Sequence, residues 1–87
     1  MNNIVIAFPK KEVANSIKKI LAQSGYTVTA VANTGASALS SMNGLNMGII
    51  ICGYRFSDMM YSEIYEYMPR EFHMLLIASA GGMMDKT

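Results

Sequence analysis

The sequence predicts an α/β fold of three layers, in which a parallel sheet lies between helices. The first observation is the run Ile-Ile-Ile-Cys at residues 49–52, which is apolar throughout and shows no polar alternation. A strand of this composition needs cover on both faces, so it belongs in the middle of a sheet. The second observation is that strand patterns alternate with helix patterns along the chain, as in successive βαβ units. With right-handed crossovers, the expected strand order is 2-1-3-4.

The chain is expected to begin with a strand and an amphipathic helix. Residues 3–7, Asn-Ile-Val-Ile-Ala, are short and β-branched and form the first buried strand. Pro9 is suited to open a helix over residues 10–24, because the first helical turn does not need the missing N–H. The apolar residues that recur at helical spacing, and are predicted to face the core, are Val13, Ile17, Ile20 and Leu21. Gly25 is predicted to end this helix.

A second strand and a second helix follow. Residues 26–31 alternate polar and apolar side chains, which is typical of a strand at the edge of a sheet. Asn33 or Thr34 is the expected cap of a short helix over residues 35–42. The residues of this helix that are predicted to point inward are Ala36, Leu39 and Met42. Asn-Gly at 43–44 ends the helix before the central strand begins.

A third helix and a fourth strand complete the predicted sheet. Residues 60–68 carry apolar and aromatic side chains at helical spacing. Asp58 or Ser57 is the expected cap of this helix, and Pro69 is the expected stop. Residues 74–78 form a second fully apolar strand, yet no later segment covers its outer edge or its second face. We therefore expect a second copy of the chain to pair through that edge or through the helices beside it.

Composition and charge limit the class of protein. Of the 87 residues, 52% are hydrophobic and only 15% are charged, which is fewer charges than in an average soluble domain. Residues 1–80 are expected to form one domain and residues 81–87 a tail. The net charge of +1 gives no field that would attract nucleic acid or an anionic membrane. The single cysteine, Cys52, and the lack of a signal peptide or membrane span predict a cytoplasmic protein.

The order and spacing of these segments resemble the receiver domain of two-component response regulators, which has a flavodoxin-like fold. The resemblance runs from residue 3 to about residue 82, and the fifth strand of that family is missing. The segments that carry it are residues 3–7, 13–26, 36–39, 49–59 and 76–80. Gly-Tyr-Arg-Phe at 53–56 and Lys-Lys-Glu-Val-Ala at 10–14 most resemble the antitermination type, in which a receiver precedes an RNA-binding module called ANTAR.

The resemblance implies a phosphoryl switch whose residues are mostly replaced in this chain. Receiver domains phosphorylate an aspartate after the third strand, and an acidic pair after the first strand helps to hold Mg²⁺. Here Gly53 stands at the phosphoacceptor position, and Phe8 and Pro9 stand at the acidic pair. Only Ser79 matches, as the hydroxyl residue that follows the fourth strand. The chain therefore looks like a pseudo-receiver, and we expect no catalytic residue, no metal, no cofactor and no enzymatic activity.

The predicted function is phosphorylation-independent signalling through binding, linked to transcription antitermination. The expected partners are a second copy, another protein or the chain's own output domain; RNA would be bound only through a C-terminal module absent from this sequence, and no membrane is involved. Two alternatives stay open. Lys10, Lys11, Arg55 and Ser79 could surround an anion or a nucleotide at the carboxyl edge of the sheet, unless they are simply solvated. Asp58 could replace the missing phosphoacceptor, unless it serves as a helix cap.

Overall fold

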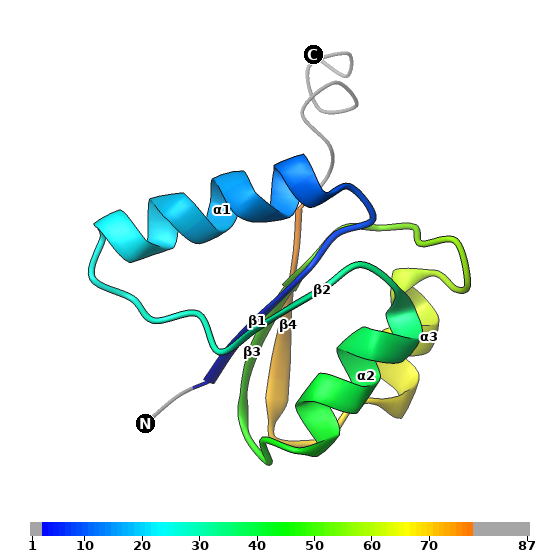
Figure 1. Cartoon of the computed structure of the whole chain (residues 1–87). Helices are drawn as coiled ribbons and strands as arrows, with labels where there is room; N and C mark the ends of the chain where they lie inside the picture. The colour runs from blue at the N-terminus through cyan, green and yellow to red at the C-terminus, as the bar shows by residue number, and fades with distance from the viewer. Residues whose placement is uncertain (1–2, 78–87) are drawn as a thin grey trace, which may run out of the picture.

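The computed structural model describes residues 3–77 of the chain. Strands and helices alternate in the order β1 (Asn3–Ala7), α1 (Lys11–Gln23), β2 (Ala30–Ala32), α2 (Gly35–Asn43), β3 (Gly48–Cys52), α3 (Tyr61–Tyr67) and β4 (Phe72–Leu76). The four strands form one parallel sheet of order β2-β1-β3-β4. α1 lies on one face of this sheet, and α2 and α3 lie on the other (Figure 1). The predicted three-layer α/β fold and the predicted strand order are confirmed.

The central position of β3 is also confirmed. β3 pairs with β1 on one side and with β4 on the other, so that Ile50 lies between Val5 and Met74. Ile50 and Cys52 are fully buried. An unbroken apolar run is needed here because both faces of this strand are covered.

The two faces of the sheet are covered to different extents. The buried cluster on the α2 and α3 side has ten members and includes Met42, Phe56, Ile64 and Phe72. The buried cluster on the α1 side has only four, which are Ile6, Phe8, Ala14 and Ile51. Two helices and a loop therefore seal one face, whereas a single helix covers part of the other.

The prediction for α1 is confirmed for Ile17 and Leu21, which pack against the sheet, and is wrong for two other side chains and for the first residue of the helix. Val13 and Ile20 are 36% and 60% exposed, whereas Ala14 is fully buried against the sheet. The small side chain of Ala14 allows close packing beneath the helix, so Ala14 faces the sheet in place of Val13. Pro9 does not open the helix, because Lys10 is an extended N-cap residue and the helix begins at Lys11. Gly25 does close it, with a φ of 92° and an N–H bonded to the Ala22 carbonyl.

The second strand is shorter than the predicted 26–31 and ends one residue later. The Tyr26 N–H donates to the Leu21 carbonyl of α1 at 2.9 Å, so the chain at Tyr26 still closes the helix. At Thr29 the side-chain hydroxyl accepts from the Ile4 N–H at 3.3 Å, which replaces a backbone bond of a regular ladder. β2 itself is an edge strand, as predicted, and Val31 is 39% exposed.

Smaller corrections concern α2, α3 and β4. Thr34 caps α2, as one of the two expected caps, but Ala36 is exposed rather than inward. α3 spans Tyr61–Tyr67 rather than 60–68, and β4 begins at Phe72 and ends at Leu76 rather than spanning 74–78. Ser79 and the expected tail lie outside the described residues.

Candidate functional site: the carboxyl edge of the sheet

The carboxyl ends of β1 and β3 bring two predicted site segments together. Ala7 and Cys52 are partners in the register, so the residues that follow them are neighbours. The Gly53 N–H donates to the Ala7 carbonyl at 3.0 Å and extends the ladder by one bond. The structure therefore places Gly53, which the sequence resemblance aligns with a phosphoacceptor position, directly beside Phe8 and Pro9.

The Phe8 ring fills the space above Gly53. A Cβ atom at position 53 would lie 3.1 Å from Phe8 Cδ1, 3.4 Å from Phe8 Cε1 and 3.8 Å from Pro9 Cδ. Phe8 is only 4% exposed, and Gly53 is buried. A carboxylate at position 53 would therefore push against an aromatic ring that offers neither a hydrogen-bond donor nor a cation. Hydrophobic packing occupies this part of the edge.

Cys52 immediately precedes Gly53 and is also unsuited to chemistry. Its side chain is fully buried, and burial raises the pKa of the thiol from 9.0 to about 11. The thiolate is the nucleophilic form of cysteine, and at neutral pH such a thiol stays protonated. Cys52 thus acts as a packing residue of the core.

The loop from Gly53 to Met60 is folded back on itself and fixed at several points. The Tyr61 N–H donates to the Tyr54 carbonyl at 2.9 Å, and the Phe56 N–H donates to the Met59 carbonyl at 2.8 Å. The rings of Tyr54 and Tyr61 meet edge to face, with centroids 5.2 Å apart. Phe56 is only 5% exposed and belongs to the core on the α2 and α3 side. These contacts hold the loop in a defined conformation.

Asp58 is a helix cap, but it caps α2 and not α3. Its Oδ1 and Oδ2 atoms accept hydrogen bonds from the backbone N–H groups of Gly35 and Ala36, each at 2.9 Å. These two bonds hold the pKa of the Asp58 carboxyl below its usual value of 3.8. Thr34 Oγ1 accepts from the Ser37 N–H at 3.1 Å. The first three N–H groups of α2 are therefore all satisfied, two of them by a residue from a distant loop.

The prediction that Asp58 or Ser57 caps α3 is therefore wrong. The N-cap of α3 is Met60, whose N–H donates to Glu63 Oε1 at 3.5 Å. Met59, between the two caps, packs its side chain over Gly35, where any Cβ would collide with it. The pairing of Asp58 with α2 spans more than twenty residues. A local capping pattern in the sequence gives no signal for it.

The three predicted anion-binding cations are exposed at this edge. Lys10 precedes α1, Lys11 begins it, and Arg55 pairs with Met60 in an isolated antiparallel bridge. Within residues 3–77, none of the side-chain hydrogen bonds involves them. Ser79, the fourth member of that predicted site, lies outside the described residues. An anion site stays a prediction.

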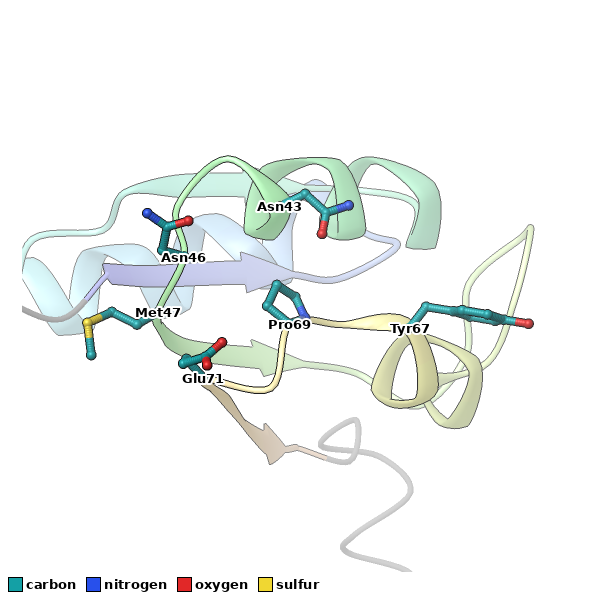
Figure 2. Close-up of a pocket in the computed structure, with 6 residues that line it drawn as sticks. All are labelled: Asn43, Asn46, Met47, Tyr67, Pro69 and Glu71. Atoms are coloured by element: carbon teal, nitrogen blue, oxygen red, sulfur yellow. The ribbon is translucent and has the colours of Figure 1, made fainter.

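A shallow hollow lies at the opposite, amino edge of the sheet. Its volume is about 480 Å³, and it lies where α2, β3, α3 and β4 approach one another (Figure 2). The residues that line it are Asn43, Asn46, Met47, Tyr67, Pro69 and Glu71. Figure 2 shows the Tyr67 side chain pointing away from the other five. Four of these lining residues carry polar groups, which are two amides, a phenol and a carboxylate, but they do not form a nucleophile–base pair or a metal-ligand set.

Two further findings concern the described residues as a whole. No three or more histidine, cysteine, aspartate or glutamate side chains among them gather as metal ligands do. In the same part of the chain, no helix has the length and apolar character that crossing a membrane requires.

Comparison with known proteins adds no identity: no family model, no curated protein and no solved structure matches the chain. The class of protein is therefore defined by its fold and by the carboxyl edge of its sheet. Residues 3–77 form a three-layer α/β arrangement with four parallel strands, consistent with a flavodoxin-like fold whose fifth strand is not among these residues. At the edge where such folds hold their ligands, this chain packs a phenylalanine against a glycine.

Proposed function

We propose that the chain is a receiver-like signalling module of the response-regulator type that acts by binding and without phosphoryl transfer. The observation that supports this most directly is the Phe8 ring over Gly53. Phosphoryl transfer to a receiver needs a carboxylate nucleophile and a divalent cation held by oxygen ligands. Gly53 provides no nucleophile, and Phe8 and Pro9 provide no ligand. The scaffold is kept, and its phosphorylation site is closed by packing.

Asp58 is a poor substitute for the missing nucleophile. Both of its carboxylate oxygens accept hydrogen bonds from the N-terminus of α2. Transfer of a phosphoryl group to either oxygen would disturb one of these bonds, which satisfy the first two N–H groups of α2 beside the Thr34 cap. The arrangement therefore favours a structural role for this carboxylate over a chemical one.

The proposed module regulates through contacts with other proteins. Its partners are a second copy of the chain or an output domain, and the proposed output is transcription antitermination in the cytoplasm. RNA would be bound by that output module and not by residues 3–77. The module performs no enzymatic reaction of its own.

Intact-mass measurement after incubation with acetyl phosphate and Mg²⁺ tests the proposal. We expect the mass of the chain to stay unchanged, because neither a nucleophile nor a metal site is present at Gly53. Asp58→Asn is the matched control for the alternative acceptor. An acid-labile phosphoryl adduct on the natural chain that is absent from Asp58→Asn would contradict the proposal and identify Asp58 as the acceptor.

A further inference from the structure

Two helices end at the hollow on the amino edge of the sheet. Asn43 is the last residue of α2, Tyr67 is the last residue of α3, and both line the hollow. Each helix runs opposite to the strands, so both finish at the edge where the strands begin (Figure 1). The carbonyl groups of a helix point toward its C-terminus, and the last four lack a regular partner within the helix. Two sets of such carbonyl groups are therefore aimed at the same region.

Most of these carbonyl groups receive no bond from the chain that follows, in contrast to those of α1. At the end of α1, the N–H groups of residues 24–26 donate to the carbonyl groups of residues 20–22, which are three of the last four. Within residues 3–77, the chain beyond each of the other two helices donates to only one of the last four carbonyl groups. These are the carbonyl groups of Met42 in α2 and Ile64 in α3. The ends of α2 and α3 therefore keep hydrogen-bond acceptors for a ligand.

The charge around the hollow also favours a cation. Glu71 is the one charged residue among those that line it. Neither α2 nor α3 has a basic residue in its last turn, where a cation would offset the partial negative charge of the helix end. The lysines of residues 3–77 lie on α1 or just before it, across the sheet (Figure 1). Arg70 adjoins Glu71 in the chain, but it does not line the hollow, and its side chain makes none of the hydrogen bonds found in this part of the chain.

The side chains of the hollow suit a cationic group on an apolar stem. The Glu71 carboxylate and the amide oxygens of Asn43 and Asn46 are acceptors, and Met47 and Pro69 supply apolar contact. A guanidinium group carries five N–H donors in one plane, so it can bond several separate acceptors at once. It is also more weakly hydrated than an ammonium group. In an open hollow, where a ligand keeps part of its water, the guanidinium group therefore binds better.

We propose that the hollow binds an arginine side chain of a protein partner. The guanidinium group bonds the Glu71 carboxylate and the carbonyl groups at the ends of α2 and α3, and its methylene stem lies on Met47 and Pro69. The volume of about 480 Å³ is within the range of ligand sites, about 300 to 1,000 Å³. Because the hollow is shallow, it holds only the end of a ligand, and a protein supplies the remaining contact. This inference rests on the proposed function, since it names the chemistry of the partner that the module binds.

An NMR titration of the isotope-labelled 87-residue chain with N-acetyl-arginine amide tests the inference. We expect saturable shifts of the amide signals of Asn43, Asn46 and Glu71, with a dissociation constant of about 1 to 10 mM, because an exposed ion pair is weak. N-acetyl-citrulline amide has the same shape without the charge and should bind at least about tenfold more weakly. N-acetyl-lysine amide should bind at least about threefold more weakly, because its ammonium group is compact and strongly hydrated.

Two neighbouring residues provide a matched pair of variants. Glu71→Gln removes the carboxylate of the hollow and should weaken binding of the arginine amide by at least about fivefold. Arg70→Gln removes the adjoining cation and should leave binding unchanged or make it tighter. Glu12→Gln removes a carboxylate from α1 and should change the dissociation constant by less than about twofold, as the control for charge lost elsewhere. All three positions are exposed, and thermal unfolding checks that each variant is folded.

Each other outcome overturns the inference in a recognisable way. Absence of saturable shifts up to about 20 mM arginine amide shows that the hollow has no such affinity. Equal binding of the citrulline amide, or unchanged binding by Glu71→Gln, shows that charge does not drive the contact. Equal binding of the lysine amide contradicts the choice of a guanidinium group. The mass measurement with acetyl phosphate does not depend on the hollow, so a chain without binding and without an adduct contradicts only this inference, whereas an adduct contradicts the proposed function.

Discussion

The two faces of this sheet are built differently, although the same strands form both. On the α2 and α3 side, two helices and the anchored loop after β3 enclose a continuous core. On the α1 side, one helix covers a smaller cluster and leaves Leu75 and Ile20 exposed. Most of the apolar area removed from water lies on the first face, so that face supplies most of the stability. On the second face, apolar side chains of the described residues stay exposed.

The largest effect on the free energy of unfolding is expected at β4, where two residues that point to opposite faces of the sheet can be compared. Phe72 is 2% exposed in the closed core, whereas Leu75 is 54% exposed on the open face. Phe72→Ala should lower the free energy of unfolding by about 3 to 5 kcal/mol, a large share of the total for a small domain. Leu75→Ala should lower it by less than about 1 kcal/mol when the protein is dilute enough to be monomeric. Urea denaturation measures both. Equal losses would contradict the difference between the faces.

A somewhat smaller effect is expected where the Phe8 ring closes the carboxyl edge. Gly53→Ala places a methyl group 3.1 Å from Phe8 Cδ1 and should cost about 1 to 3 kcal/mol through overpacking. Gly53→Asp adds an unpaired carboxylate to the same crowding and should cost more than Gly53→Ala. Urea denaturation of the two variants side by side gives the difference. A Gly53→Asp variant as stable as the natural chain would show that the edge is open.

A smaller effect, with a defined pH dependence, is expected at Asp58. Hydrogen bonds from Gly35 and Ala36 lower the pKa of the Asp58 carboxyl in the folded chain. The carboxylate therefore stabilises the fold fully at a pH above the pKa that Asp58 has in the unfolded chain. This contribution is lost as the pH falls through the folded pKa. Asp58→Asn should therefore lower the urea midpoint of unfolding at pH 7, and the variant should lose less stability than the natural chain when the pH is lowered. Glu66→Gln, at an exposed position of α3, is the control. Identical acid profiles for Asp58→Asn and the natural chain would contradict the cap.

The smallest effect on stability is expected at the three exposed cations of the carboxyl edge, which belong to neither buried cluster. Lys10→Ala, Lys11→Ala and Arg55→Ala remove exposed side chains and should each change the free energy of unfolding by less than about 0.5 kcal/mol. Thermal shift measurements with phosphate and with nucleotides test the alternative anion site at the same residues. A rise in Tm that grows with anion concentration, and disappears in Lys10→Ala or Arg55→Ala, would support that alternative.

The order of the elements could be predicted from the sequence because its signals are local. The apolar run 49–52 identifies the central strand, and apolar residues at helical spacing identify the helices. The inward face of α1 could be predicted only in part. Ile17 and Leu21 pack on the sheet as predicted, but the close packing of Ala14 leaves Val13 and Ile20 exposed. The start of β2 was misplaced because Tyr26 remains bonded to α1.

Which residues meet at the carboxyl edge of the sheet could be predicted from the strand order, but their contacts could not. The sequence resemblance identifies Gly53, Phe8 and Pro9 as replaced switch positions, and the structure shows these residues packed together. The cap formed by Asp58 joins residues that are distant in the sequence, so it depends on tertiary packing. Sequence patterns within one helix therefore assigned this carboxylate to the wrong helix.

An NMR measurement of the contact between Gly53 and Phe8 tests the central claim most directly. We predict nuclear Overhauser effects between the Gly53 Hα protons and the Phe8 ring protons, unchanged after addition of Mg²⁺ and acetyl phosphate. Loss of these effects on that addition, together with a shift of the Asp58 amide signal, would show that the edge opens and accepts a phosphoryl group.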